Sequence, residues 1–517
     1  MRVASPTGKV CRERDEADAV EGGCVTVHRS RLATLLVVLL VLLGIGVRLL
    51  QFWRNDSLML DECAVCLNVA NRDLGGFTRR LRYDQAAPLG FLIFQKTVFA
   101  TVGMDDITTR VVPLIFGLLT IVLIVLLSRR LFDIKSNPCA TILAIGLIAL
   151  NRGIIGYSAT AKQYSLECAI TLLLLLALAQ CIGEVDSRGS PASRTLLVLS
   201  PALLWFSYGA VFIIGGMGAA LIGRAAFLKR SEAWKLAIYF GLAAFLMLVP
   251  FYLLSMHAAS ANRALAADWA RSYLPLWPPE ATVLWLYHHF VSVGEMLIHL
   301  RLAFCVPLAL FAVAIQAVYS RSWFWIAGVT SILLSLMASA LHYYPFEGRL
   351  LLFLMPVFAL ITADAVKLVE RRSQLAAAFI TGTLLVAATA AVSLHGMFRH
   401  RPVDNVRKVH EEMVSRMAPG DQLWVSSLAT PCFLYYIRQY PLPHDVSVHF
   451  LQPGEQPVLP NGHDWVLVMR TPWEPGEGEA LLAAGAERGK EESSFDVEWT
   501  TARLFTVRGT RTDQIAH

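Results

Sequence analysis

Charged side chains are scarce in this sequence. Only 16% of its 517 residues are Asp, Glu, Lys or Arg, and 56% are apolar, whereas soluble domains are about 25% charged. The apolar residues gather in runs of about 20, the length that a helix needs to cross the hydrocarbon core of a bilayer. The short alternating segments of a β-barrel are lacking. We therefore expect a polytopic α-helical membrane protein, because helices satisfy their own backbone hydrogen bonds in lipid.

The sequence also lacks the marks of a nucleic-acid-binding protein. Its formal net charge of +6 is modest and dispersed, and no helix-turn-helix, zinc-finger or RNA-binding signature occurs. A small positive charge suits an anionic membrane surface or an anionic ligand. We therefore expect the lipid bilayer, and not nucleic acid, as a partner.

Cysteines and metal ligands form no strong pattern. The nine cysteines are scattered, and Cys63 and Cys66 make a lone CxxC outside the predicted spans. We interpret this pair as two small residues on a short helix, in preference to a disulfide or redox pair. No cluster of metal ligands stands out, so no cofactor is predicted and a divalent metal is left open.

Hydropathy divides the chain into three parts. Residues 1–30 are polar and are predicted to be a disordered cytoplasmic tail, 31–396 a transmembrane domain, and 397–517 a small α/β domain on the outer face. About eleven spans are expected, and two long outer loops, 54–106 and 256–301, interrupt them. The predicted spans are 32–52, 107–128, 138–151, 164–183, 195–208, 209–228, 235–255, 302–319, 323–341, 350–369 and 375–395.

Alternating apolar residues in the last part predict strands, and the stretches between them predict helices. The expected strands are 422–427, 446–451, 465–470 and 504–507, and the expected helices are 403–417, 431–439 and 478–484. The short loops rich in Arg and Lys place the N-terminus in the cytoplasm, and both long loops and the C-terminal domain outside. This predicts a multi-pass protein of the cell (inner) membrane with an extracytoplasmic, in Gram-negative terms periplasmic, functional face.

Acidic residues close to the outer membrane surface are the first candidates for chemistry. Asp61 and Glu62 follow the first span closely. Adjacent acids suit the first turn of a helix, but a carboxylate there is also placed to take a proton from an attacking hydroxyl. Neighbouring residues on a helix do not share a face, so one acid is the base and the other points elsewhere. Further along the loop, Tyr83, Asp84 and Gln85 either cap the next helix or offer polar groups to a ligand.

Several cations stand at outer span ends, against the positive-inside trend. They are Arg110, Arg152, Lys162 and Arg349. A lipid phosphate is a natural partner, and arginine can bind it bidentately. The alternative is snorkelling to ordinary headgroups.

These residues occur in an order that resembles the GT-C membrane glycosyltransferases, especially bacterial relatives of the protein O-mannosyltransferases and of the lipid A aminoarabinose transferase. The resemblance covers residues 32–395. It rests on Asp61-Glu62 soon after the first span, a loop acid near Pro88-Leu89, Arg110-Val111-Val112-Pro113 with Gly117, Ala161-Lys162-Gln163-Tyr164, and Gly348-Arg349 before a Leu/Phe-rich span.

The resemblance implies a GT-C-like fold and inverting transfer of a sugar from a polyprenyl-phosphate donor to an acceptor hydroxyl. Asp61 then corresponds to the catalytic carboxylate, with Glu62 beside it. The resemblance implies that Lys162 and Arg349 bind the donor phosphate, assisted by Arg110 and Tyr164. The acceptor or the sugar is then bound by Tyr83, Asp84, Gln85 and Tyr344. Many relatives have a His before the Pro-Leu pair where this chain has Tyr83-Asp84-Gln85, which argues against a His-assisted or metal-assisted site. The acceptor is left open among lipid, glycan and protein.

Other classes fit less well. A lipid transporter or flippase usually carries ionisable residues deep in its spans, and the span centres here are almost free of them. A non-catalytic glycolipid-binding scaffold would tolerate a neutral residue at position 61. An envelope ligase or polymerase of another fold is disfavoured by the early Asp-Glu pair.

Overall fold

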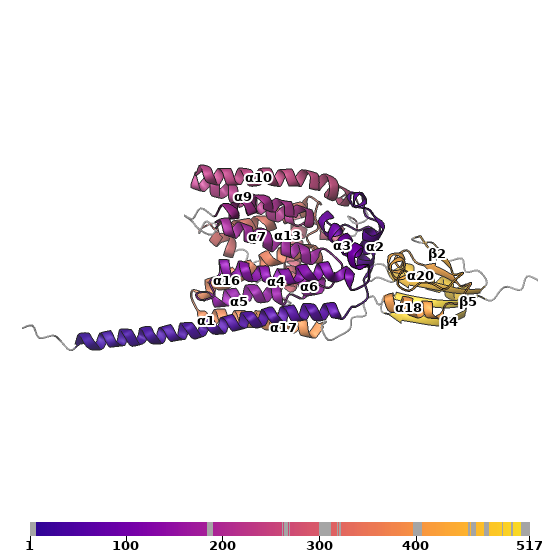
Figure 1. The fold of residues 1–517 in the computed structure, drawn as a ribbon, viewed down its shortest axis with the longest axis horizontal. Helices are drawn as coiled ribbons and strands as arrows, with labels where there is room; N and C mark the ends of the chain where they lie inside the picture. Colours follow the sequence, from indigo (N-terminus) through magenta and orange to yellow (C-terminus); the bar gives the residue numbers. More distant parts are fainter. Residues whose placement is uncertain are drawn as a thin grey trace, which may run out of the picture.

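The computed structural model describes residues 7–182, 190–260, 262, 267, 269–298, 312–317, 319, 322–395, 406–452, 455, 462–469, 475–488, 490–497 and 500–507. Figure 1 shows helices running side by side along the long axis, with α2 and α3 across one end and the C-terminal sheet beyond them. The fold is therefore a helical bundle with a small sheet domain at one end.

Among the described residues, seven helical segments are long and apolar enough to cross a membrane. They are Ser30–Trp53, Thr108–Leu131, Tyr164–Ile182, Ala210–Leu228, Ser231–Ser260, Trp323–Ala340 and Gly348–Glu370. They correspond to the helices α1 (Thr7–Trp53), α4 (Val111–Leu131), α7 (Tyr164–Ile182), α9 (Ala210–Leu228), α10 (Ser231–Phe251), α15 (Trp323–Ala340) and α16 (Met355–Glu370). The 3-10 segments η2 (Thr108–Arg110) and η6 (Gly348–Leu354) lead into α4 and α16.

Further helices account for other predicted spans. The 12-residue helix α5 (Pro138–Ala149) and α17 (Gln374–His395), whose apolar stretch is Gln374–Ala390, lie where two spans were expected. The predicted span 195–208 consists of α8 (Pro191–Leu199) and the 3-10 helix η3 (Ser200–Phe206), which carries Pro201 at its start. Most of the predicted span 302–319 lies outside the described residues. The count of eleven thus stays a prediction.

Helix α1 begins before the first predicted span. It starts at Thr7, in a stretch for which the sequence predicted no ordered structure. Figure 1 shows α1 extending past the bundle at the end opposite the sheet domain.

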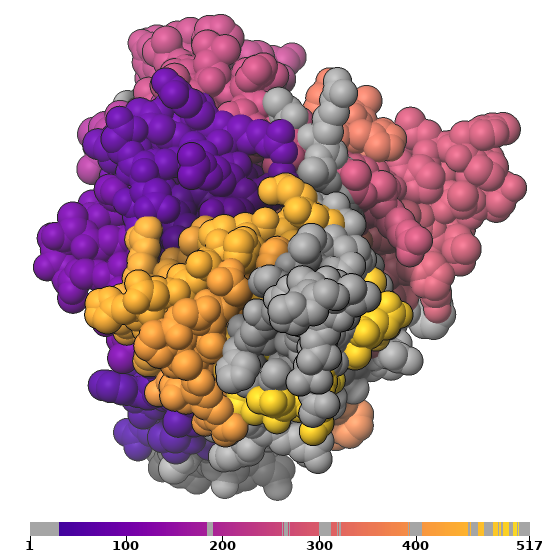
Figure 2. All heavy atoms as spheres, turned by 90° about the vertical axis from the view of Figure 1, so that its right-hand side faces the viewer, coloured from indigo at the N-terminus to yellow at the C-terminus, as the bar shows by residue number. Residues whose placement is uncertain are grey.

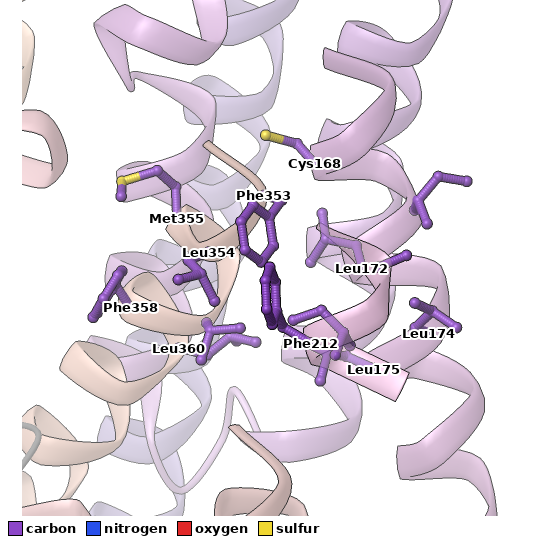
Figure 3. Close-up of a cluster of buried hydrophobic side chains, with 14 of the residues drawn as sticks. Cys168, Leu172, Leu174, Leu175, Phe212, Phe353, Leu354, Met355, Phe358 and Leu360 are labelled. Atoms are coloured by element: carbon purple, nitrogen blue, oxygen red, sulfur yellow. The ribbon is translucent and has the colours of Figure 1, made fainter. Parts of the chain in front are cut away.

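The bundle is held together around α7. Its side chains are almost all buried, as expected for a helix surrounded by others. Phe212 of α9 stacks on Phe353 of η6, with ring centroids 5.8 Å apart, and Figure 3 shows this pair among Leu172, Leu175 and Phe358. Helices α4 and α6 (Arg152–Tyr157) approach closely at Gly117, where a Cβ would lie 2.2 Å from the Ser158 hydroxyl. A side chain there would force these two helices apart.

Both predicted outer loops contain helices. The first holds α2 (Leu60–Asn71), η1 (Gly75–Thr78) and α3 (Leu89–Val102). The π-helical turn η4 (Tyr252–Met256) follows Pro250 at the end of the span predicted at 235–255. The second loop then holds the short α11 (His257–Ser260), η5 (Ala270–Ser272) and the 20-residue α13 (Pro279–Ile298). A π-helical turn beside an in-helix proline is a common way to relieve the missing hydrogen bond.

In its described residues, the C-terminal domain has a five-stranded sheet and three helices. The strand order is β2-β1-β3-β5-β4, with β1 parallel to β2 and β3, and β5 antiparallel to β3 and β4. The strands are β1 (Gln422–Val425), β2 (Ser447–Phe450), β3 (Gly462–Met469), β4 (Lys490–Val497) and β5 (Thr500–Val507), and the helices are α18 (Val406–Arg416), α19 (Thr430–Tyr436) and α20 (Pro475–Arg488). The four predicted strands and three predicted helices each overlap one of these elements, and β4 was missed.

The sheet domain packs directly on α2. Cys63, Cys66 and Leu67 share one buried cluster with Tyr435 and Tyr436 of α19. Figure 2, which views this end of the molecule, shows the indigo first loop lying against the orange C-terminal domain. Helix α2 is therefore held between the membrane bundle and the sheet domain.

Candidate active site

Asp61 lies in the first turn of α2, at the junction of the bundle and the sheet domain. The turn is fixed because the Met59 N–H donates to Glu62 Oε2 over 3.0 Å, a reciprocal arrangement that satisfies an orphan donor of the helix start. The Asp61 side chain is 27% exposed, while that of Glu62 is 2% exposed. As expected for neighbours on a helix, the two acids face different surroundings.

Three polar side chains from distant parts of the chain meet Asp61. Arg349 Nη1 lies 2.5 Å from Asp61 Oδ2, and Lys162 Nζ lies 3.9 Å from the same oxygen. Gln85 donates from Nε2 to Asp61 Oδ1 over 3.4 Å and accepts from Lys162 at Oε1 over 2.5 Å. The four side chains form one network, in which a single carboxylate faces two cations.

The cations decide the charge state of this carboxylate. Burial acts to raise the pKa of Asp61, but the charges of Lys162 and Arg349 outweigh it and lower the pKa to about 2. Asp61 is therefore ionised at neutral pH. Burial lowers the pKa of Lys162 to about 8, an effect that the charge of Asp61 partly offsets. The amine is protonated at neutral pH and loses its proton at mildly alkaline pH.

Lys162 sits in a tight turn before α7. The turn closes with a hydrogen bond from the Lys162 N–H to Thr160 O over 2.7 Å. The Ala161 N–H donates to Glu62 Oε1 over 2.6 Å, so α2 holds this turn in place. The Lys162 side chain is 5% exposed. It extends toward Asp61 from a turn that these hydrogen bonds hold in place.

Arg349 approaches from the other side, at the start of η6. The preceding residue, Gly348, has φ of +51°, a conformation that glycine adopts without the penalty of a side chain. The Arg349 guanidinium lies 5.8 Å from the ring centroid of Trp269, and its charge acts on the nearby Tyr157 hydroxyl. Its side chain remains 34% exposed. Arg349 thus combines a fixed position with access to a ligand.

Glu62 and Arg110 form a separate buried pair. Arg110 Nε is 3.7 Å from Glu62 Oε1, and these side chains are 4% and 2% exposed. Arg110 Nη2 also donates to Ser57 O over 3.3 Å. Burial raises the pKa of Glu62, which the charge of Arg110 partly offsets. In the structure Glu62 joins α2 to the Lys162 turn, and Arg110 pairs with Glu62 and not with Asp61.

The other candidate residues spread over the surroundings. Asp84 is exposed and pairs with Arg80 over 2.6 Å. Tyr83 precedes it, and its carbonyl accepts from Gln85 over 3.0 Å. Tyr164 is buried edge-to-face against Tyr157, with ring centroids 4.8 Å apart. Tyr344 packs on Phe212 and donates to Leu350 O over 2.9 Å, which places it behind the η6 segment.

Trp269, Tyr157 and the docking contacts of the C-terminal domain were missed. Asp106, 3% exposed, accepts from Arg407 Nη1 over 2.8 Å and from the Tyr436 hydroxyl over 3.2 Å. These residues belong to no motif, and only the folded chain brings them together. Within the described ranges, no group of three or more His, Cys, Asp or Glu side chains is arranged to hold a metal ion.

Comparison with solved structures finds similar folds. The crystal structure of ArnT from Cupriavidus metallidurans bound to undecaprenyl phosphate matches with a TM-score of 0.54 and 11% sequence identity, over 90% of this chain and 97% of that one. Its apo form matches with a TM-score of 0.53, the same identity and the same coverage. The oligosaccharyltransferase of Archaeoglobus fulgidus gives a TM-score of 0.47 at 15% identity, over 78% of this chain and 61% of that one.

This chain has the GT-C fold. ArnT, the lipid A aminoarabinose transferase, is a GT-C glycosyltransferase, and its whole length is nearly covered. No protein-family model matches the sequence, and no curated protein matches it either. The expected fold class, a polytopic α-helical membrane protein with a small C-terminal α/β domain, is confirmed.

Proposed function

We propose that the chain is a membrane glycosyltransferase that moves a sugar from a polyprenyl-phosphate carrier to an acceptor hydroxyl. The observation that carries this proposal is the network in which Asp61 faces Lys162 and Arg349 at the end of a GT-C bundle. The likeness to ArnT, which was crystallised with undecaprenyl phosphate, supports a donor of the same class.

Asp61 acts in this proposal as the general base. The acceptor hydroxyl attacks the anomeric carbon from the face opposite the phosphate and passes its proton to the Asp61 carboxylate. The bond between the anomeric carbon and the phosphate oxygen breaks, and polyprenyl phosphate leaves with the electron pair. A single displacement of this kind inverts the anomeric configuration. The leaving phosphate needs no proton, so one carboxylate is enough.

Lys162 and Arg349 bind the phosphate and stabilise the charge that grows on it. Fixed cations at the site of developing charge lower a barrier more than groups that must reorient. Their pairing with Asp61 also couples binding to chemistry. A phosphate in contact with both cations neutralises them, so the pKa of Asp61 rises from about 2 toward the range of a useful base.

The positive-inside pattern supports a site on the outer face of the cytoplasmic membrane. Polyprenyl tails then lie among the spans, and the first loop and the sheet domain cover the acceptor. This arrangement suits cell-envelope glycan, lipid or protein glycosylation.

Turnover of a mixed pool of radiolabelled polyprenyl-phosphate sugars in proteoliposomes tests the proposal. We expect the native chain to release sugar, and Lys162→Gln and Arg349→Gln each to lower kcat/KM about 10²–10³-fold, as for loss of one oxyanion-stabilising donor. Arg371→Gln, at the far end of α16, is the matched control and should keep native turnover. A folded native chain that uses none of the donors while moving labelled lipid across the bilayer would identify a flippase instead.

A further inference from the structure

Three cysteines meet where the first outer loop contacts the sheet domain. The predicted topology places three of the nine cysteines on the outer face, Cys63 and Cys66 in α2 and Cys432 in α19. All three are fully buried in one cluster, and all three are free thiols in the structure. The proposed sugar transfer uses none of them. They lie at the contact between the helix that carries Asp61 and the C-terminal domain.

Contacts of neighbouring residues bring Cys63 close to Cys432. The Cys63 thiol lies 3.9 Å from Leu58 O, and the Leu58 N–H donates to the Tyr436 hydroxyl over 2.8 Å. Cys432 precedes Tyr436 by four residues in α19, so the two side chains project from the same face of that helix. The helices α2 and α19 pack directly against each other. Each therefore presents a thiol to the region around Leu58.

The pKa shifts of the thiols agree with this placement. Burial raises the pKa of Cys63 well above its usual range, and the adjacent Cys432 thiol raises it further. The pKa of Cys66 is raised first by burial and then by the charges of Glu62 and Asp106. The strongest neighbour of Cys63 is therefore a thiol, and the strongest neighbours of Cys66 are carboxylates.

The location of this pair favours its oxidation. The positive-inside pattern places α2 and the sheet domain on the outer face of the membrane, where disulfides form and persist. A disulfide joins residues whose Cα atoms are about 4.4–6.8 Å apart, so it requires side chains that already touch. Cys63 and Cys432 meet this requirement from two different domains. This pairing differs from the Cys63–Cys66 pair of the CxxC sequence.

We propose that Cys63 and Cys432 form a disulfide that ties the sheet domain to the helix carrying Asp61. The Cys63 thiolate attacks a sulfur of a disulfide-carrying oxidant, and the Cys432 thiolate then attacks the Cys63 sulfur of the mixed disulfide. The two cysteines lose two electrons and two protons, and the oxidant takes up both and leaves as two thiols. Cys66 stays a free thiol. This proposal does not depend on the sugar transfer.

Docking of the sheet domain controls when this exchange occurs. Thiol–disulfide exchange requires a thiolate and access for the oxidant, and both thiols are buried while the domain is docked. The bond therefore forms while the domain is undocked, and docking then protects it. A reductant reaches the bond only through the same opening.

Mass spectrometry of the native chain tests the proposal. The full chain is purified without reductant, unfolded in the presence of N-ethylmaleimide and digested with trypsin. We expect a cross-link between peptide 55–72, which contains Cys63 and Cys66, and peptide 417–438, which contains Cys432. Fragment ions should assign the bond to Cys63. In a second sample, the cross-link should disappear with dithiothreitol and form again with oxidised glutathione.

Thermal unfolding and hydrogen exchange measure what the bond does. Reduction of the native chain should lower its unfolding temperature by about 2 °C or more and speed up hydrogen exchange in α2 and α19. The unfolding temperatures of Cys63→Ser and Cys432→Ser should not respond to reductant. Cys66→Ser changes an equally buried thiol of the same helix and is the matched control. It should keep the cross-link and the response to reductant.

Three results would overturn the proposal. The first is N-ethylmaleimide on both Cys63 and Cys432 in the native chain, before and after treatment with oxidised glutathione. The second is a bond between Cys63 and Cys66. The third is an unfolding temperature of the cross-linked native chain that reductant does not change, which would show that the bond does not tie the domains. The mapping uses the native chain, so it gives its answer even where a serine variant fails to fold.

Discussion

Asp61 is the residue on which the account depends, and its cations set its behaviour. Lys162 is nearly buried, while Arg349 is partly open, so a phosphate entering the site meets Arg349 first and Lys162 at the back. Because both cations touch Asp61 before a donor arrives, the carboxylate and the phosphate compete for the same charges. This competition makes the pH dependence of the reaction informative.

The pH profile of kcat/KM should fall on the alkaline side near pH 8. Lys162 has its pKa lowered to about 8, so its charge is present below this pH and lost above it, and donor affinity falls with it. On the acid side no limb from Asp61 is expected down to about pH 4, because its pKa in the free protein is about 2.

The profile of kcat should differ, because bound phosphate raises both pKa values. The alkaline limb of the kcat profile moves to higher pH, and kcat also falls at low pH as Asp61 becomes protonated. Lys162→Arg, which stays charged, should remove the alkaline limb of kcat/KM. Steady-state kinetics between pH 4 and 10 measures both profiles. An alkaline limb that persists unchanged in Lys162→Arg would contradict the role of Lys162.

Single residues of the site could be predicted because each carries a charged or polar side chain in an outer loop or at an outer span end. Asp61, Lys162, Gln85 and Arg349 were all named from the sequence, and the structure brings them together. Residue type alone could not separate Asp61 from Glu62, since both are acids in one helical turn; the resemblance pointed to Asp61, and the structure pairs Asp61 with Lys162 and Arg349 and Glu62 with Arg110. Trp269 carried no local signal at all.

At the scale of elements, α2 connects the parts of the site. One of its faces presents Asp61, and Glu62 binds the Lys162 turn through the Ala161 N–H. Its remaining apolar face packs on the sheet domain. Glu62 is thus a positioning residue, which acts on Lys162 through the backbone.

Breaking the Glu62–Arg110 pair should destabilise the bundle. Glu62→Gln and Arg110→Gln each leave a buried charge without its partner, at a cost of about 3–5 kcal/mol. The double variant should lose much less than the sum, because no charge is left unpaired. Thermal unfolding in detergent measures all three variants. Additive losses would show that the two side chains do not stabilise each other.

The predicted boundaries of helices and strands agree with the structure where the hydrophobic pattern is strong, and they differ from it where the pattern is weak. The predicted span at 195–208 was read from continuous hydropathy, but Pro201 follows the end of α8 and the chain continues as a 3-10 helix. Strand β4 was missed because its sequence, KEESSFDV, is mostly polar. It lies at the edge of the sheet, where polar residues are tolerated.

At the scale of the whole molecule, the sheet domain is docked through a buried polar contact. The Leu58 N–H donates to the Tyr436 hydroxyl over 2.8 Å, and this hydroxyl reaches Asp106. Arg407 adds a hydrogen bond to Asn55 O over 2.8 Å. This interface joins residues that are more than 300 positions apart in the sequence. No local sequence pattern predicts it.

Tyr436→Phe should loosen this docking. The change removes one hydroxyl and leaves the buried Leu58 N–H without its acceptor, at a cost of about 1–3 kcal/mol. Hydrogen exchange should become faster both in the first turns of α2 and in α19, and turnover should fall. Tyr239→Phe, on an exposed face of α10, is the matched control. Faster exchange confined to the sheet domain would mean that docking does not hold α2.

The most direct measurement is sugar transfer by Asp61→Asn compared with the native chain and with Asp445→Asn, an exposed carboxylate of the sheet domain. All three are reconstituted in proteoliposomes with polyprenyl-phosphate sugars and extracted cellular glycolipids, and folding is checked by thermal unfolding. The account predicts that Asp61→Asn loses about 10²–10⁴-fold in kcat, the range for a general base, while Asp445→Asn keeps native turnover. Native turnover by folded Asp61→Asn would contradict the account.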